Sequence, residues 1–388
     1  MWSNLAVEAN EREDSDSSEV FFKRAIATEP NFTTGYMNLG YFYKEENRTQ
    51  DAIEIYRMAA DLITVGLADE NSAINVSPKD VKVYTALANM LREYPESYEE
   101  AYELTKKAVK QEPNWEESHN MMGNCLVKLG RFSEARDAFK KSVKLNPDFA
   151  IGHSNLGHAH QELSETAEAE SHYRQALRLD GNHTLTKFRL AKLISDTPPK
   201  SMHRLEEADV LLSEVLETDP ENGNATFCRG LVQYDLHNYT MTEELFLLTL
   251  NFTTNHSGAL YNLGVLYTEL NRLSECVKIL EQLRESDHAH LLGHTQLGTC
   301  LMKMKDYARA REVFTSVLEV DPDHLMALQN YGIMLIELRE NREALEIFTQ
   351  LSRLDPSDVA FVRQAELLHQ HIQKRSQRKF YTDGSTQD

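Results

Sequence analysis

The sequence predicts an all-α fold, a solenoid of about ten helical hairpins. The first observation is a short motif, NLG in GYMNLGYFY (residues 35–43), whose glycine position recurs along the chain. Six of the nine intervals between successive copies are 34 residues long, one is 35, and the other two contain insertions near 65–80 and 196–202. The position is filled by Ala6, Gly40, Ala88, Gly123, Gly157, Ala191, Gly230, Gly264, Gly298 and Gly332. A fixed period of this length is typical of a repeat protein.

The second observation is that other landmarks keep the same spacing. A small residue stands twelve positions after the glycine, a bulky one stands sixteen after it, and a proline tends to close the unit. The small residues are Ala52, Ala135, Ala169, Cys276, Ala310 and Ala344, the bulky ones include Tyr56, Phe139, Tyr173 and Phe314, and the prolines include Pro30, Pro113, Pro147 and Pro322. Glycine inside a helix costs about 0.5–1 kcal/mol relative to alanine. Its recurrence therefore predicts a close approach of two helices, with the glycine facing the small residue.

This skeleton resembles the tetratricopeptide repeat (TPR) superfamily from residue 2 to about 356. The resemblance implies a right-handed superhelix of helix-turn-helix repeats. We expect residues 1–356 to form the ten-repeat array, 357–373 to form a capping helix, and 374–388 to form a polar, disordered tail. Trp2 already falls inside a first helix, which predicts that the chain is a piece of a longer protein.

Composition narrows the classes of partner. With 41 basic and 61 acidic residues the net charge is −20, and no basic stripe is present to displace counterions from a nucleic acid. We therefore expect no nucleic-acid partner. No apolar run approaches the roughly 18 residues of a membrane span, so we expect no span in this chain.

An amide recurs two residues before the glycine position. The predicted ladder consists of Asn4, Asn38, Asn155, Asn262, Gln296 and Asn330, with gaps at Ala86, Met121, Arg189 and Cys228. An amide side chain can bond both the N–H and the C=O of one peptide unit. The ladder resembles that of the TPR superhelix in the nucleocytoplasmic O-GlcNAc transferase, which implies a grip on an extended peptide in the concave groove. The alternative is that these side chains are simply solvated.

A terminal-carboxylate site of the co-chaperone TPR type is a weaker match. Asn124, Asn155 and Arg189 fit that pattern, but Asn120 and Leu185 stand where lysines are needed. Two missing charges disfavour this mode of binding.

No catalytic residue, metal site or cofactor motif is predicted. The histidine groups around His153 and His290 have no third ligand placed beside them, so we expect surface or packing histidines. Cys125, Cys228, Cys276 and Cys300 lack metal-binding spacing and are expected to be structural thiols. Cys276 and Cys300 lie in adjacent repeats and could approach each other.

Eight N-x-S/T sequons occur, against roughly three expected by chance for such a motif. The candidate acceptors are Asn31, Asn47, Asn75, Asn182, Asn224, Asn238, Asn251 and Asn255. Most fall at expected turns, which indicates a lumenal or extracellular setting.

The segments 259–283 and 297–322, and the spacer ending in SPKDVKVYTALANML, resemble the C-terminal TPR region of the transmembrane-and-TPR (TMTC-type) O-mannosyltransferases of the endoplasmic reticulum. In that family a membrane half uses dolichyl-phosphate mannose to mannosylate acceptors such as cadherins. The resemblance implies that this chain recognises an acceptor or docks a partner in the lumen, and gives it no catalytic residue. The alternative is a soluble cytoplasmic TPR scaffold or co-chaperone adaptor.

Overall fold

The chain folds into helices joined by short turns and loops over the residues described by the computed structural model, which are 2–12, 14–68 and 81–383. Within these ranges there are 21 α-helices and a 3-10 turn at Pro95–Ser97, and no β-strand. The predicted all-α solenoid of helical hairpins is therefore confirmed. The helices group into two compact units, Met1–Lys200 and Ser201–Asp388, and the division falls at the second predicted insertion.

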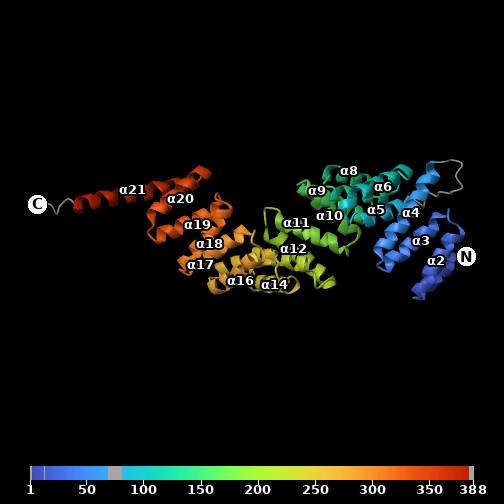
Figure 1. The fold of residues 1–388 in the computed structure, drawn as a ribbon, viewed down its shortest axis with the longest axis horizontal. Helices are drawn as coiled ribbons and strands as arrows, with labels where there is room; N and C mark the ends of the chain where they lie inside the picture. Colours follow the sequence, from blue (N-terminus) through green and yellow to red (C-terminus); the bar gives the residue numbers. More distant parts are fainter. Residues whose placement is uncertain (1, 13, 69–80, 384–388) are drawn as a thin grey trace. The chain divides into compact units, whose positions relative to one another are not determined.

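Unit 1 contains five hairpins and one further helix (Figure 1). The pairs are α1 (Trp2–Glu11) with α2 (Ser15–Thr28), α3 (Thr33–Glu45) with α4 (Thr49–Ala68), α5 (Lys82–Leu91) with α6 (Tyr98–Gln111), α7 (Glu116–Lys128) with α8 (Phe132–Leu145), and α9 (Ala150–Glu162) with α10 (Thr166–Leu179). The turn η2 (Pro95–Ser97) precedes α6, and α11 (Thr184–Asp196) ends the unit.

Unit 2 begins with α12 (Met202–Thr218) and continues with four hairpins. These are α13 (Gly223–Asp235) with α14 (Tyr239–Phe252), α15 (Ser257–Glu269) with α16 (Leu273–Ser286), α17 (Leu291–Lys303) with α18 (Tyr307–Val320), and α19 (Leu325–Glu337) with α20 (Asn341–Leu354). The helices of the sixth predicted hairpin, α11 and α12, thus belong to different units. One continuous right-handed array stays a prediction.

The turns inside the hairpins share a backbone device that the sequence analysis did not identify. Seven residues after the fixed glycine, one residue has a positive φ, close to the left-handed helical region. These residues are Asn47, Gly130, Ser164, His237, Asn271, Lys305 and Arg339. The left-handed residue ends the first helix and turns the chain into the second.

The fixed glycine faces an aromatic ring or a leucine more closely than it faces the small residue. A Cβ atom at Gly40 would lie 2.7 Å from the Tyr56 ring, and one at Gly123 would lie 2.4 Å from the Phe139 ring. At Gly157 the small residue is also among the nearest neighbours, since the carbonyl oxygen of Ala169 would lie 3.1 Å from such a Cβ. The glycine therefore makes room for the bulky residue sixteen positions later, and the gain in packing offsets its low helix propensity.

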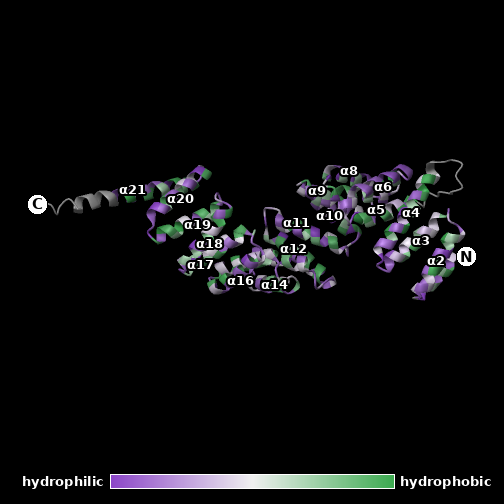
Figure 2. Ribbon diagram, viewed as in Figure 1, coloured by the Kyte–Doolittle hydropathy of each residue, from purple (hydrophilic) through white to green (hydrophobic). Residues whose placement is uncertain are grey.

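Buried apolar side chains join successive hairpins into cores. In unit 2 one cluster of buried residues extends from Phe246 to Leu368, and in unit 1 two clusters cover Ala6 to Cys125 and Leu126 to Ala159. Figure 2 shows the alternation of hydrophobic and hydrophilic residues along the helices that produces these buried faces.

The last helix, α21 (Val359–Asp383), buries Phe361 and Leu368 against the unit 2 core. It is longer than predicted, because the segment 374–383, expected to belong to a disordered tail, is helical. The physical reason is that this segment is rich in Lys, Arg and Gln, which favour helices, and contains neither glycine nor proline. Residues 384–388 lie outside the described part.

Candidate functional site

The six predicted ladder residues all lie on the first helices of hairpins. Asn4 is exposed and the other five are half-buried. Their positions are Asn4 on α1, Asn38 on α3, Asn155 on α9, Asn262 on α15, Gln296 on α17 and Asn330 on α19. We call the side of the first helices that carries these positions the ladder face. Their function in holding a peptide stays a prediction.

Threonine hydroxyl groups orient the amides of unit 2. Gln296 donates from Nε2 to Oγ1 of Thr268 on α15 (2.9 Å), and Asn330 donates from Nδ2 to Oγ1 of Thr299 on α17 (3.0 Å). Asn262 donates from Nδ2 to the carbonyl oxygen of Gly258 in its own helix (2.7 Å). These bonds connect α15, α17 and α19, and we call Asn262, Gln296 and Asn330 the amide row.

Each member of the amide row keeps capacity for a ligand. A primary amide has two N–H donors and an oxygen with two lone pairs, and one N–H is used in each of the bonds above. One N–H and the oxygen remain, which is the complement of a single peptide unit. Because the side chains are already oriented, binding loses less conformational entropy. Sequence reasoning missed Thr268 and Thr299, and no repeat signal could have found them, because Thr268 stands four residues after its fixed glycine and Thr299 only one residue after its own.

Exposed apolar side chains flank the amide row. Leu292 and Met326 lie one helical turn before Gln296 and Asn330, and each is 46% exposed, while Ile333 is 37% exposed. Residues three or four apart share one face of a helix. The ladder face of unit 2 therefore offers amides for a peptide backbone and apolar surface for its side chains.

The ladder face of unit 1 has a different chemistry. Asn155 donates from Nδ2 to Oδ1 of Asn120 on α7 (3.0 Å), and Arg189 of α11 donates from Nη1 to Oδ1 of Asn155 (3.4 Å). Arg189, which the sequence pattern counted as a gap, therefore touches a predicted ladder residue. The structure adds no support for a terminal-carboxylate site of the co-chaperone type, because Asn120 and Leu185 supply an amide and an apolar group where that site needs two cations.

Several histidines cap helices. Nδ1 of His290 accepts a hydrogen bond from the backbone N–H of Gly293 at the start of α17 (3.0 Å), and Nε2 of His294 lies 3.2 Å from the carbonyl oxygen of Asp287. The same capping bond is made at the starts of α11, α15 and α19 by His183, His256 and His324. An acceptor at this position satisfies a backbone donor at the start of a helix.

Another group of histidines packs between α9 and α10. Nδ1 of His153 lies 3.2 Å from Nδ1 of His172, and the rings of His160 and His172 stack with centroids 5.4 Å apart. Burial, together with the nearby imidazoles of His153 and His160, lowers the pKa of His172 to about 4. Within the described residues no three His, Cys, Asp or Glu side chains are arranged to hold a metal ion.

A disulfide bond joins Cys276 on α16 to Cys300 on α17. The expectation of structural thiols was therefore wrong for this pair, because the second helix of one hairpin packs against the first helix of the next and brings the two side chains together. Both cysteines are fully buried. Cys125 and Cys228 are buried thiols, as expected.

The sequon asparagines lie on the surface. Seven of the eight are in the described part of the chain, and all seven are exposed; they are Asn31, Asn47, Asn182, Asn224, Asn238, Asn251 and Asn255. Five lie in turns or at helix caps, while Asn224 and Asn251 lie in the first and last turns of helices. Asn75 lies outside the described residues. Among the helices that the structure describes, none has a stretch apolar and long enough to cross a bilayer.

Family models for the tetratricopeptide repeat match several separate parts of the chain. The matched residues are 33–63, 123–164, 152–183, 258–287 and 301–365. The matches fall in both units and include most of the hairpins that carry the amide row.

Among curated proteins, the chain is similar to human Protein O-mannosyl-transferase TMTC3, with 26% identity over 319 residues, which is 82% of this chain and 35% of the relative. It is also similar to Protein O-mannosyl-transferase Tmtc3 of Drosophila melanogaster, with 34% identity over 299 residues, which is 77% of this chain and 32% of the relative. The chain thus spans about a third of the length of these relatives.

Among solved structures, the Cut9–Hcn1 hetero-tetramer of APC/C matches with a TM-score of 0.53 and 17% identity, covering 84% of this chain and 60% of that one. A tetratricopeptide repeat protein from Parabacteroides merdae matches with a TM-score of 0.50 and 18% identity, covering 66% and 98%. At this identity the likeness shows the fold alone.

Proposed function

Because the chain is a tetratricopeptide repeat protein that resembles the TMTC-type O-mannosyltransferases, we propose that it binds an extended segment of a protein along its ladder face. We further propose that this happens in the lumen of the endoplasmic reticulum. There the chain would serve as the acceptor-recognition or partner-docking part of a protein O-mannosyltransferase that uses dolichyl-phosphate mannose.

The observation that carries this proposal is the amide row. Its three members lie on successive first helices, and packed helices are about 8–10 Å apart. An extended chain advances about 3.3 Å per residue, so neighbouring amides of the row would contact peptide units three residues apart. Leu292 and Met326 offer apolar contacts to the side chains in between. Backbone bonding with few side-chain requirements suits a protein that must accept many sequences.

The disulfide and the sequons support a lumenal setting. Disulfides persist in oxidising compartments and are rare in the cytosol, and the Cys276–Cys300 bond is fully buried. All seven described sequon asparagines are exposed, so a glycan at any of them would not displace core side chains. In a cytoplasmic scaffold the disulfide would be unusual and the sequons would not be glycosylated.

Substitution of the amide row tests peptide binding. The probe is a displayed library of random 12-residue peptides, from which the wild-type chain is expected to enrich binders. Replacing Asn262, Gln296 and Asn330 by alanine should weaken binding of peptides held by unit 2 by roughly ten- to a thousandfold, at 0.5–1.5 kcal/mol per amide. Replacing Gln282 and Gln350, two amides on second helices, is the matched control. Unchanged affinity in the triple variant would discard the amide row as a peptide site.

The link to mannosylation needs a separate readout. The same three substitutions in the full-length protein of the cell are expected to lower the amount of O-mannose on secretory glycoproteins, measured by mass spectrometry, without lowering the amount of the protein itself. Loss of peptide binding with unchanged O-mannose would remove the acceptor-recognition role and leave partner docking.

Glycosylation tests the compartment. Expression through the secretory pathway should give a ladder of masses that an endoglycosidase collapses, with Asn75 and Asn238 among the occupied sites. Asn→Gln substitution at each occupied site should remove one step of the ladder. A folded, secreted chain without any glycan would contradict the lumenal setting and favour the cytoplasmic scaffold.

A further inference from the structure

The ladder face of α11 carries two cations that form no ion pair with a carboxylate in the part of unit 1 that the structure describes, although the charge of Glu162 acts on Arg189 from a greater distance. Arg189 stands at the ladder position of its repeat, and Lys192 follows three residues later. Side chains three apart lie on the same face of a helix, so the two charges are neighbours. Lys192 is exposed and Arg189 is half-buried.

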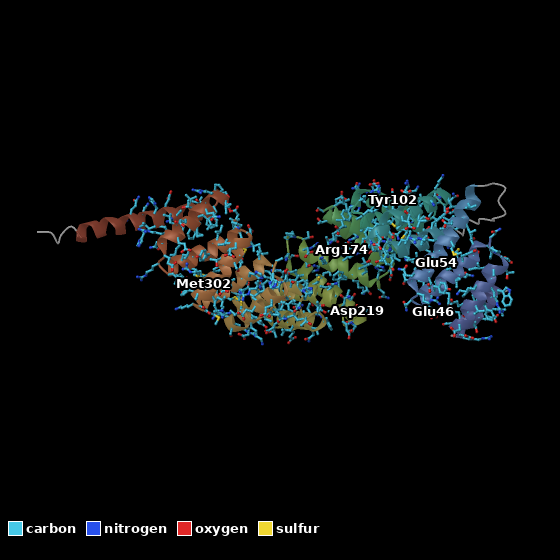
Figure 3. All side chains as sticks on the ribbon, in the orientation of Figure 1. Glu46, Glu54, Tyr102, Arg174, Asp219 and Met302 are labelled. Carbon is cyan, nitrogen blue, oxygen red and sulfur yellow. A yellow bond between two sulfur atoms is a disulfide. The ribbon has the colours of Figure 1, made fainter. Side chains whose placement is uncertain are left out.

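The chain has 61 acidic residues against 41 basic ones, and most arginines of unit 1 pair with a carboxylate. Arg24 and Arg178 have no described carboxylate partner but are exposed, whereas Arg189 is half-buried. Arg174 on α10, labelled in Figure 3, pairs with Glu170 at 2.9 Å. Arg136 on α8 pairs with Glu165 at 3.1 Å. Arginines of unit 1 therefore commonly pair with a carboxylate on the same helix or a nearby one, and Arg189 forms no such pair.

The guanidinium of Arg189 has free donors. Its Nη1 donates to Oγ of Ser154 (3.3 Å) and to Oδ1 of Asn155 (3.4 Å), both long for hydrogen bonds. Its Nε and Nη2 make no hydrogen bond with the described residues. Neither nitrogen is among the fully buried polar atoms that lack a hydrogen-bond partner, so both remain accessible to a ligand. Burial lowers the pKa of Arg189, which means that the charge is partly removed from water. A carboxylate would stabilise such a partly desolvated guanidinium, because its charge-assisted hydrogen bonds replace those that the group has lost to water.

We propose that Arg189 and Lys192 bind the side-chain carboxylate of an aspartate or glutamate in an extended peptide that lies along the ladder face of unit 1. A guanidinium offers paired donors that match the two oxygens of a carboxylate, and the lysine adds a second positive charge. This inference rests on the proposed function, and it assigns to unit 1 a preference that the neutral amide row of unit 2 lacks.

The neighbouring groups favour one internal acidic residue. Asn155, at hydrogen-bond distance from Arg189, keeps one N–H and a lone pair for the peptide backbone, so the chain continues past the site and the carboxylate belongs to a side chain. At about 3.3 Å per residue, the acidic residue stands within about two positions of the peptide unit that Asn155 holds. On α9 the carboxylate of Glu162 lies 3.4 Å from Nε2 of His158, and its negative charge disfavours a run of acidic residues.

The experiment compares the wild-type full chain with the Arg189→Asn variant on the same library of random 12-residue peptides, displayed so that no peptide has a free C-terminus. Asparagine occupies this position in other repeats, so the variant restores the ladder and is expected to fold. The wild type should enrich Asp or Glu at one position of its binders, and the variant should enrich peptides without that preference. Arg178→Gln, on α10, removes the same charge from an exposed arginine and is the control.

Synthetic peptides give the magnitude. A selected peptide with its single Glu should lose roughly 10- to 100-fold in affinity for the wild type when that Glu becomes Gln, and less than about threefold for Arg189→Asn. Lys192→Gln, at an exposed site, should lose part of the same preference. Binders without an acidic preference would overturn this inference and leave peptide binding intact. Failure of the wild type to enrich any peptide would overturn both. A preference that appears only with a free peptide C-terminus would also overturn it, since the ligand would then be a chain terminus.

Discussion

Oγ1 of Thr268 on α15 accepts a 2.9 Å hydrogen bond from Nε2 of Gln296 on α17. The same hydroxyl donates to the carbonyl oxygen of Gly264 in its own helix at 2.7 Å, which fixes the position of the oxygen. Thr268 therefore holds the amide of the next hairpin in place. The backbone of one repeat orients a binding group of its neighbour through a single threonine.

Thr268→Val is expected to weaken peptide binding to unit 2 by about two- to tenfold, the worth of one hydrogen bond of 0.5–1.5 kcal/mol. Valine keeps the shape of threonine, so the melting temperature should change little. The measurement is the affinity of a selected peptide, with Thr315→Val as control, since that hydroxyl bonds within α18. Equal affinities of the two variants would show that Gln296 needs no orientation.

Reduction of the disulfide is expected to destabilise unit 2. For cysteines separated by 24 residues, the chain-entropy model gives about 3.5 kcal/mol. Chemical denaturation of the wild type, followed by circular dichroism, should show this loss when a reductant is added. The Cys276→Ala/Cys300→Ala variant should have the stability of the reduced wild type, and adding the reductant should not change it. A wild type that is equally stable in both conditions would indicate that the bond contributes no stability.

Unit 1 is expected to lose stability in mild acid through His172. Because the folded pKa of His172 is about 4 and the ordinary value is 6.5, the unfolded chain binds the proton more readily between these values. The stabilising contribution is complete above pH 6.5 and is lost as the pH falls toward 4. For a half-buried ring, we expect a loss on the order of 1 kcal/mol between pH 7 and pH 5.

His172→Leu, which places an aliphatic residue where other repeats have Ile55 and Leu245, should remove this part of the acid sensitivity. Trp2 and Trp115 both lie in unit 1, so fluorescence during urea unfolding reports on that unit. His203→Gln, at an exposed site, should keep the wild-type dependence on pH. Identical pH profiles for all three proteins would contradict the prediction.

Gly123→Ala is expected to destabilise unit 1 by about 1–3 kcal/mol, as overpacking commonly does. The added Cβ would lie 2.4 Å from the ring of Phe139, and the ring is buried among neighbours that resist movement. Gly181→Ala, where the nearest atom would lie 3.6 Å away, is the matched control and should be neutral or slightly stabilising. Urea unfolding checks both, and equal stability of the two variants would contradict the close packing at Gly123.

The sequence by itself determined the helices, their pairing and the place of the insertions, because the same pattern of glycine, small, bulky and proline positions recurs with a period of about 34 residues in ten copies. It also placed the six ladder residues on first helices, since a position fixed relative to the glycine is fixed on the hairpin. The repeat pattern did not determine every helix end, and α21 extends past 373 because residues 374–383 contain no residue that stops a helix.

Only the tertiary structure decided which side chains meet between hairpins. The disulfide of Cys276 and Cys300, the bond of Thr268 to Gln296, and the approach of Arg189 to Asn155 all cross from one hairpin to the next. The residues of each pair are 24 to 34 positions apart, and a repeat pattern fixes what each hairpin contains but not the rotation and offset with which it packs on the next. Those depend on the summed fit of many buried side chains, such as Tyr56 and Phe139 against their glycines. The charge left unpaired at Arg189 is a consequence of that fit.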